Sequence, residues 1–491
     1  MTAEKLGLSS AEECQYDIVI AGARIIDGTG SAGWTGDLGI IKDRIVAIGD
    51  LSASSFRHKI DARRLAVAPG FIDAHTHDDG ALIDLPLLAP KVSQGVTTVV
   101  TGNCGFSLAP LQIGDRPLPP PLDAVSPRHL YRFARFADYL DALRSEPPAV
   151  NVAPLVGHGT MRVAVLSKLD RPADAGERAA MERLTDEAVT AGAIGLSSGL
   201  FYPPAQAAPP EEVAQLARRF TSTGGIYAAH IRDEADNVVA ALDEAFWIAR
   251  DASLPLILSH HKVSGQCNHG RSRQTLPHIA RARASQPIGL DAYPYAASST
   301  MLNPVSWADA TRTIVTWCEK YPSFAGRDLS DIAGELGMSE RDTIDALIPA
   351  GGIFFMMDEE DVARILSVPE TMIGSDGIPF DAHPHPRLWG SFTRVLGHYA
   401  RDRGLFSIEE AVRRMTSLPA GQFRLADRGI LAPGSYADLV LFDPDTVADA
   451  ATFATPKLPS IGIHSVFVNG IEVWSDGTST GHRPGRVLTR G

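Results

Sequence analysis

Short runs of apolar and β-branched residues mark both ends of the chain. Gly39–Ile48 is typical of the N-terminal part, because it is strand-like, lies among Gly and Asp turns and shows no helical periodicity. Ala437–Phe442 has the same character near the C-terminus, and Asn469-Gly470 is a strong hairpin signal in a later run of this kind. We therefore predict one small β-sandwich built from residues 1–68 and 426–491.

The middle of the chain alternates strand-like and helix-like segments. Helical patterns such as Asp174–Ala191, Pro210–Thr221 and Ala235–Asp251 separate most of the apolar strand candidates. Such alternation implies a parallel sheet, and eight units fit a (β/α)8 barrel, so we predict an α/β protein whose barrel spans residues 69–425. The strand candidates are Gly70–His77, Val96–Gly102, Asn151–His158, Ala193–Gly199, Ile226–Ile231, Leu254–His261, Ile288–Tyr295 and Thr371–Ser375.

Two intervals within the predicted barrel are too long to be simple loops. Ser107–Val150 contains a predicted helix around Tyr131–Arg144. Residues from about 300 to 355, between the seventh and eighth strands, are predicted to form a helical insertion with helices at Trp307–Glu319 and Ser339–Ile348. Long excursions at this face of a barrel build lids and substrate pockets, although the insertion could instead pack against a neighbouring subunit.

Composition and charge narrow the class of protein. Of 491 residues, 44% are hydrophobic and 21% are charged, which is ordinary for a soluble globular protein. The net charge of −13 argues against nucleic acid or an anionic membrane as the main partner, but it leaves an anionic substrate open. No apolar run is long enough to span a bilayer, and residues 1–10 lack the pattern of a signal peptide. The cysteines, which show no Cys-x-x-Cys spacing and fit a reducing cytoplasm, are Cys14, Cys104, Cys267 and Cys318.

The segment Pro69–Asp79 carries the strongest chemical signal. Its apolar start ends in His75-Thr-His77, and residues i and i+2 of a strand share a face, so both imidazoles can point at one metal ion. A bare His-x-His is more often a pair of surface histidines. The full string Gly-Phe-Ile-Asp-Ala-His-Thr-His-Asp resembles the first-strand motif of the amidohydrolase superfamily, and the second Asp narrows the likeness to the D-aminoacylases, or N-acyl-D-amino-acid deacylases. The segment Gly434–Val440 is similar too, so the resemblance spans nearly the whole chain.

Several residues of metal-ligating type stand at or just after the ends of the predicted strands. The carboxyl ends of barrel strands converge on one pocket, and sulfur, imidazole and carboxylate donors suit zinc. Each residue alone is a weak signal, since a lone Cys is usually part of a core, but together they predict a metal site. The candidate ligands are His75, His77, Cys104, His230, His260 and Asp376.

Cys104, in the turn Thr-Gly-Asn-Cys-Gly, is the candidate for a bridging ligand. Many amidohydrolases bridge two metals with a carboxylated lysine from the fourth strand, but the corresponding segment Gly195–Leu200 contains no lysine. The resemblance to D-aminoacylases implies a tight zinc site and a second, weaker site. Cys104, His230 and His260 would form the tight site, and His75, His77, Cys104 and Asp376 the weaker one.

Asp376 is expected to be the catalytic residue. A carboxylate beside a metal can take a proton from water and later give it to the leaving nitrogen of an amide, whereas a plain turn Asp would only bond its own backbone. His260 and His261 are adjacent in the sixth strand and cannot both face inward. We assign His260 to the metal, Lys262 to the pocket, and His261 to an outward, structural position.

The resemblance to D-aminoacylases also implies how a substrate is held. It assigns the substrate α-carboxylate to Lys262, Tyr293, Ser299 and Arg387. The alternative for Arg387 is a surface ion pair. His158, in the segment Val-Gly-His-Gly, is either a substrate contact or part of a plain turn.

The resemblance thus leads us to expect a zinc-dependent hydrolase that splits a small-molecule N-acyl-D-amino acid into a carboxylate and a D-amino acid. Neither nucleic acid nor a membrane is expected as a partner, and a homo-oligomer is left open. One rival is a cyclic-amide hydrolase acting on a hydantoin- or dihydroorotate-like ring, against which the missing lysine and the Asn-Cys-Gly turn argue. Another rival is a non-catalytic scaffold, which would be expected to have lost metal ligands or Asp376.

Overall fold

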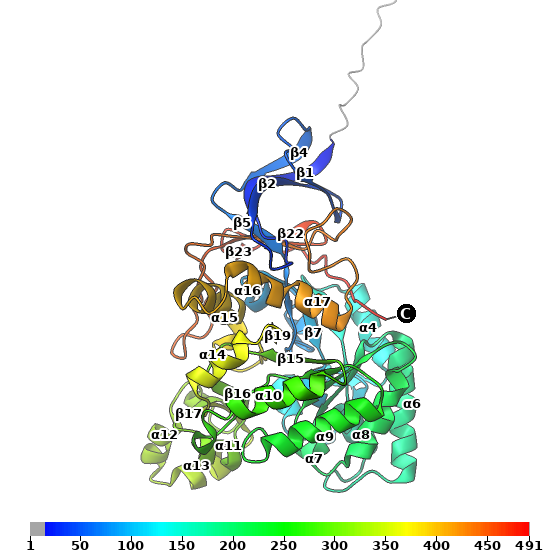
Figure 1. The fold of residues 1–491 in the computed structure, drawn as a ribbon. Coiled ribbons are helices and arrows are strands. Elements are labelled where there is room, and N and C mark those ends of the chain that lie inside the picture. Colours follow the sequence, from blue (N-terminus) through cyan, green and yellow to red (C-terminus); the bar gives the residue numbers. More distant parts are fainter. Residues whose placement is uncertain (1–14, 491) are drawn as a thin grey trace, which may run out of the picture.

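The computed structural model describes residues 15–490 of the chain. Residues 1–14, which include Cys14, the start of the predicted sandwich and the segment on which the signal-peptide prediction rests, lie outside the described part. Figure 1 shows a sheet formed by the chain ends at the top and a larger body of strands surrounded by helices below it.

Both ends of the chain contribute strands to one sheet of nine. The ends meet where β5 (Ala66–Pro69) runs antiparallel to β20 (Leu439–Phe442), over a core that includes Ile20 and Leu38. This pairing confirms that the two termini build one β unit, while the domain boundaries at residues 68 and 426 stay a prediction. The other strands are β1 (Tyr16–Ile25), β2 (Trp34–Ile41), β3 (Arg44–Gly49), β4 (Phe56–Asp61), β21 (Ile463–Val468), β22 (Ile471–Ser475) and β23 (Thr478–Ser479).

The eight predicted barrel strands are all present, with shorter bounds than predicted. They are β6 (Phe71–Asp73), β7 (Val96–Thr101), β10 (Asn151–Pro154) with β11 (Val156–Gly157), β12 (Gly195–Gly199), β13 (Ile226–His230), β14 (Leu256–Leu258), β15 (Ile288–Ala292) and β19 (Thr371–Ile373). They pair in parallel as β6-β7-β10 and as β11-β12-β13-β14-β15-β19. The ring closes between its first and last strands, where the Ala74 N–H donates to the Ile373 carbonyl at 3.2 Å. The carboxyl ends of all eight strand positions therefore surround one site.

Helices pack around the outside of these strands (Figure 1). The long helix α6 (Ala175–Ala191) begins with a capping box between Asp174 and Glu177 and ends at Gly192 in the left-handed region, so local sequence defines both of its ends. The predicted helices of the barrel are confirmed, with boundaries shifted by a few residues. The helices are α1 (Ala81–Asp84), α2 (Ala89–Val92), α3 (Leu122–Val125), α4 (Phe136–Ser145), α5 (His158–Val165), α6 (Ala175–Ala191), α7 (Pro203–Gln206), α8 (Pro210–Ala217), α9 (Val238–Asp251), α10 (Ser272–Arg283), α14 (Glu359–Ser367), α15 (Arg387–Arg394), α16 (Ile408–Met415) and α17 (Ser417–Phe423).

An insertion lies between β15 and β19, as predicted, but it is mixed α/β rather than purely helical. Its strands β16 (Ala297–Met301) and β17 (Thr313–Cys318) both pair antiparallel with β18 (Ala350–Phe355). The predicted helix Trp307–Glu319 is wrong, because its β-branched run forms β17, whereas the helix predicted at Ser339–Ile348 is confirmed. The helices of the insertion are α11 (Pro304–Asp309), α12 (Leu329–Leu336) and α13 (Glu340–Leu347).

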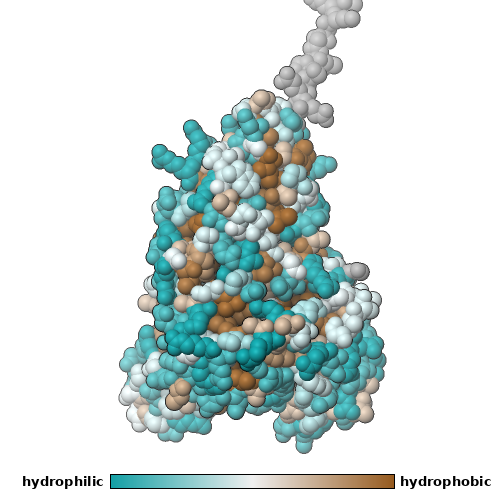
Figure 2. Space-filling view, viewed as in Figure 1, coloured by the Kyte–Doolittle hydropathy of each residue, from teal (hydrophilic) through white to brown (hydrophobic). Residues whose placement is uncertain are grey.

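The surface of the molecule differs between its two parts. In Figure 2 hydrophilic residues cover most of the lower, barrel part of this face, whereas hydrophobic residues reach the surface more often over the terminal sheet. Trp34, Ile41 and Ile471 are exposed apolar residues of that sheet. None of the helices within residues 15–490 combines the length and the apolar character that crossing a membrane requires.

Candidate metal centre and active site

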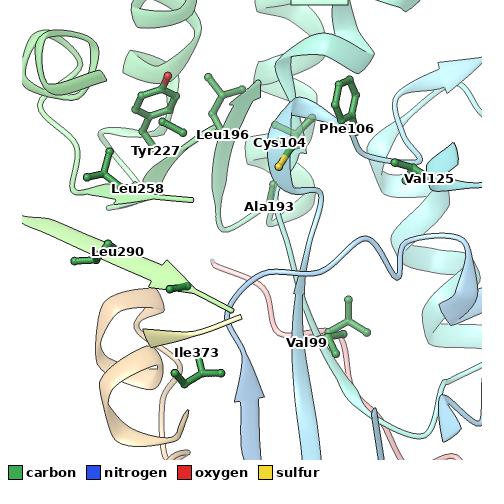
Figure 3. Packing of buried hydrophobic residues seen from close by; sticks show 14 of the residues in the cluster. Val99, Cys104, Phe106, Val125, Ala193, Leu196, Tyr227, Leu258, Leu290 and Ile373 are labelled. Atoms are coloured by element: carbon green, nitrogen blue, oxygen red, sulfur yellow. The ribbon is translucent and has the colours of Figure 1, made fainter. Parts of the chain in front are cut away.

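A tight turn after β7 places Cys104 at the centre of the barrel mouth. Gly102 and Gly105 flank it with positive φ angles of 75° and 78°, and both pack closely on neighbouring strands. A Cβ on Gly102 would lie 2.1 Å from the Leu155 carbonyl oxygen, and one on Gly105 would lie 2.9 Å from the Gly199 nitrogen. Only glycine fits these two positions without a rearrangement. Figure 3 shows Cys104 in this turn, in the same loop as the buried Phe106.

The structure brings most of the predicted ligands together. The Cys104 sulfur lies 3.2 Å from His75 Nε2 and 3.3 Å from His260 Nε2. Potential ligand atoms of these three residues and of Asp376 all lie within 4.8 Å of one another. His230, Glu234 and His260 form a second group by the same criterion, so the two groups share His260.

Unpartnered nitrogen atoms show that this cluster fits a metal. Both ring nitrogens of His230 are buried and have no hydrogen-bond partner among residues 15–490. Burying a polar group without a partner is unfavourable, and a metal ion would provide the missing partner. A set of thiolate, imidazole and carboxylate donors suits zinc.

The electrostatics of the cluster favour its charged forms. Burial alone raises the pKa of the Cys104 thiol, but His75 and His260 outweigh burial and hold this pKa well below its usual value. Burial likewise raises the pKa of Asp376, but Arg387 and His260 hold that pKa well below its usual range. Both side chains are therefore anionic, which is the form that binds metals.

Three residues of the cluster have strained backbones. Cys104, His260 and Asp376 have φ angles of 54°, 34° and 48°, in the left-handed region that most residues avoid. Such conformations cost roughly 1–3 kcal/mol each and occur mainly at functional sites, where the surroundings enforce them. The strain supports a functional role for the turn after β7 and the segments after β14 and β19.

Two carboxylates that sequence reasoning missed support the histidines. Glu234 lies 3.1 Å from His260 Nδ1, and Asp291 accepts the His260 backbone N–H at 2.9 Å. Asp291 also lies 3.4 Å from His75 Nδ1. Asp291 stands at the end of the seventh strand, so the rule that found the ligands could have found it too, whereas Glu234 lies in a loop that gave no such signal.

A buried lysine joins the first and last barrel strands beneath the cluster. Lys91, on α2, donates to Asp73 at 2.8 Å, to Thr76 at 2.9 Å and to Ser375 at 2.7 Å. Its amino group also lies 3.3 Å from Asp78. His75 and His77 lie among the Lys91 partners at and just after the end of β6, and Asp376 follows Ser375, so the lysine fixes the backbone on both sides of the site.

Four of the predicted substrate-binding residues converge beside the cluster. Arg387 lies 2.9 Å from an Asp376 carboxylate oxygen, donates to the Ser299 carbonyl at 3.1 Å and stacks 4.6 Å from the centre of the Tyr293 ring. Lys262, the fourth, donates to Glu234 at 2.7 Å. Arg387 is buried rather than on the surface, so its ion pair is an internal one.

Two other histidines lie away from the cluster. His158 is bonded to Glu212 at 3.0 Å and is fully buried at the start of α5. His261 faces away from the metal ligands and is bonded to Thr275 at 2.9 Å. Neither residue belongs to the lining of the cavity described next.

A cavity of about 320 Å³ opens beside the cluster. It is bounded by the loops after β12 and β13 on one side and by the insertion on the other, so the insertion covers part of the site. Its lining includes Phe201, Tyr202, Gln206, His230, Arg232, Asp233, Glu234, His260, Lys262, Ser298, Ser299, Asn303, Val305, Ser306, Asp309, Met356 and Asp376.

An eight-stranded barrel with such a ligand cluster at the carboxyl ends of its strands defines a metal-binding barrel enzyme. A model of the Amidohydrolase family matches residues 59–291 and 323–478. The chain is 55% identical over 483 residues to a D-aminoacylase of Alcaligenes xylosoxydans xylosoxydans, covering 98% of this chain and 99% of that protein. The chain belongs to the amidohydrolase family and, within it, to the group of the D-aminoacylases.

Two further relatives support this placement. The chain is 53% identical over 479 residues to an N-acyl-D-aspartate deacylase of the same organism, covering 97% of this chain and 96% of that protein. It also matches the solved structure of an N-acyl-D-glutamate deacylase from Bordetella bronchiseptica complexed with zinc and a phosphonate inhibitor, a mimic of the tetrahedral intermediate. That match has 46% identity and a TM-score of 0.93, over 97% of this chain and 100% of the other.

Proposed function

We propose that the protein hydrolyses the acyl amide bond of N-acyl-D-amino acids and releases a carboxylate and the free D-amino acid. The observation that carries the proposal is the buried group of Cys104, His75, His260 and Asp376 beside a cavity. The names of the three relatives support a linear N-acyl substrate rather than a cyclic amide.

The proposed metal is zinc, held by residues that the cluster brings together. We assign a tight site to Cys104, His230 and His260, and a second, weaker site to His75, His77, Cys104 and Asp376. A bound zinc ion supplies Lewis-acid chemistry, because it polarises the amide carbonyl and lowers the pKa of water.

Asp376 is proposed to move the proton. Its carboxylate lies 3.2 Å from His77 Nε2 and 2.9 Å from Arg387, so it is anionic and held in place at the edge of the cavity. It takes a proton from the attacking water and gives it to the leaving nitrogen, which lets the amide bond break without expelling an amide anion.

The substrate α-carboxylate is proposed to bind beside Arg387, with Lys262, Tyr293 and Ser299 around it. Arg387 supports this role because its Nε is buried and has no hydrogen-bond partner in the described part of the chain. The planar guanidinium is suited to a carboxylate, and the Tyr293 ring beneath it fixes its plane.

A screen of matched substrates tests the proposed function. N-acetyl-D- and N-acetyl-L-forms of methionine, leucine and glutamine are incubated with the purified protein, and its zinc content is measured on the same preparation. We expect acetate release from the D-forms and little from the L-forms. No release from any D-form by the zinc-loaded protein, or equal release from both series, would contradict the proposal.

A further inference from the structure

The three relatives are named for different substrates. The overall sequence identity of this chain to each of them does not indicate which of these substrates it prefers. The D-aminoacylase and the N-acyl-D-aspartate deacylase are 55% and 53% identical to this chain. The charges that line the cavity are more informative about substrate preference. A second carboxylate on the substrate needs a cation that is free to bind it.

Arg232 is one of two Lys or Arg side chains that line the cavity, and it is fully engaged. Its Nε and Nη2 donate to Glu244 at 2.9 and 2.8 Å. Its Nη1 donates to the Gln206 carbonyl at 2.6 Å, and its Nη2 also reaches the Ala208 carbonyl at 3.0 Å. Every guanidinium nitrogen therefore already has an acceptor.

Lys262 is the other such cation, and its amino group is paired with Glu234 at 2.7 Å. Arg387, next to the cavity, is paired with Asp376 at 2.9 Å. These two cations stand beside the metal ligands, where the proposed function places the α-carboxylate. Neither is left for a carboxylate at the far end of the substrate.

The cavity also carries negative charge beyond that of the residues in contact with the metal ligands. Asp233 and Asp309 line it, and neither forms an ion pair with any residue between 15 and 490. Asp309 is on α11 of the insertion, opposite the loop after β13 that carries Asp233 and Asp236. Burial raises the pKa of Asp309, and the negative charges of Asp236 and Asp233 raise it further, so the three carboxylates are close enough to repel one another.

Neutral groups make up much of the remaining lining of the cavity. Phe201, Val305 and Met356 supply apolar surface, and Asn303 and Ser306 supply uncharged polar groups. A neutral side chain can bury apolar area here, and a cationic one can approach the carboxylates. An anionic side chain meets like charge without a free cation.

We infer that the cavity accepts N-acyl-D-amino acids with neutral or cationic side chains and rejects those with a side-chain carboxylate, an inference that rests on the proposed function. The nearly isosteric pair N-acetyl-D-glutamine and N-acetyl-D-glutamate differs mainly in this charge. At about pH 8, where a side-chain carboxyl is ionised, kcat/KM for the glutamine derivative should exceed that for the glutamate derivative by at least ~10-fold.

Removing one negative charge from the cavity tests whether charge repulsion causes the predicted discrimination against N-acetyl-D-glutamate. Asp309→Asn should raise kcat/KM for N-acetyl-D-glutamate and lower it for N-acetyl-D-lysine, each several-fold relative to N-acetyl-D-glutamine measured on the same variant. Asp331→Asn is the matched control, because Asp331 is an exposed residue of α12 in the same insertion and lies outside the cavity lining. The control should change none of the three values.

The outcomes separate the inference from the proposed function. Hydrolysis of N-acetyl-D-glutamate as fast as N-acetyl-D-glutamine, or an equal response of all three substrates to Asp309→Asn, would overturn the inference alone. No hydrolysis of any N-acetyl-D-amino acid by the zinc-loaded protein would overturn the proposed function and the inference with it.

Discussion

Asp376 illustrates how single residues define this site. Its carboxylate is held between Arg387 on one side and the imidazoles of His75 and His77 on the other, at 3.6 and 3.2 Å. The same positive charges that keep it anionic hold it in one orientation. A group so placed can exchange a proton repeatedly without moving away from the reacting atoms.

Asp376→Asn should preserve the shape of the site but remove the proton carrier. We expect kcat to fall by roughly 10⁴-fold, the upper end of a general acid–base contribution, because the same carboxylate serves both attack and departure. Steady-state kinetics on N-acetyl-D-methionine would measure the loss, and metal analysis should find the proposed tight site still filled. Substantial turnover by this variant would mean that another group moves the proton.

Arg387→Met should weaken the use of substrates that carry an α-carboxylate. The variant also removes a cation from Asp376, which slows all substrates, so the informative quantity is the difference between two of them. Relative to an amide-capped substrate, the free carboxylate substrate should lose at least ~10-fold more in kcat/KM, since charge-assisted hydrogen bonds contribute roughly 1.5–3 kcal/mol each.

Arg387→Lys is the matched variant for this comparison. It keeps the positive charge but not the planar fork, so it should restore little of the carboxylate preference. Equal losses on the two substrates would assign Arg387 to the support of Asp376 alone.

How much of the site could be predicted depended on where each residue lies. His75, His260 and Asp376 stand at or just after strand ends, where the geometry of a parallel barrel makes side chains converge. Glu234 and Lys91 come from a loop and a short helix whose paths depend on tertiary packing. No periodicity in the sequence reports such a path, so these supporting charges were missed.

At the scale of elements, the insertion shows the limit of pattern reading. The run Thr313–Cys318 could be taken as part of a helix when read with the preceding Trp307, but its β-branched residues pair with β18, more than 30 residues later. A strand that depends on a distant partner has no complete local signal. The barrel strands were easier to predict, because alternating helices reveal the repeat.

The link between β6 and β19 through Lys91 predicts an effect on stability and catalysis together. Lys91→Met would leave the buried Asp73 and Asp78 without their cation, and breaking a buried pair costs about 3–5 kcal/mol. The urea midpoint should fall, and kcat should fall with it, because the histidines and Asp376 lose their common support. Lys168→Met, at an exposed position, is the control and should leave both unchanged.

At the scale of the whole molecule, the chain ends are joined in one sheet and the barrel lies between them in sequence. Strand-like patterns at both ends, separated by a repeat of strands and helices, were sufficient to predict this arrangement. The pairing of β5 with β20 holds together segments at least 370 residues apart. Its register could not be predicted, because nothing local specifies which distant strand is the partner.

Acid should destabilise the molecule through a buried network around Glu212. Burial raises the pKa of Glu212, but a hydrogen bond with His158 and the charge of Arg162 lower it from 4.5 to about 2. A lowered pKa in the folded state contributes stability that is complete above about pH 4.5 and is lost as the pH falls toward about 2. The lowered pKa of Glu212 contributes on the order of 3 kcal/mol to the free energy of unfolding at neutral pH.

Glu212→Gln should therefore unfold at lower urea at neutral pH and lose less stability than the wild type between about pH 4.5 and 3. The adjacent, exposed Glu211→Gln serves as the control. Parallel pH profiles for the wild type and Glu212→Gln would show that this carboxylate is not the source of acid sensitivity.

The central claim is that Cys104 holds the metal on which hydrolysis depends, and zinc titration of the chelated protein tests it most directly. Wild-type activity on N-acetyl-D-methionine should rise with added zinc and saturate at about one equivalent per chain, as one tight site requires. Cys104→Ala should bind zinc more than ~100-fold less tightly and show almost no activity while remaining folded. Cys318→Ala, another buried cysteine, controls for the loss of a thiol and should titrate like the wild type. Wild-type zinc binding and rate in Cys104→Ala would contradict the account.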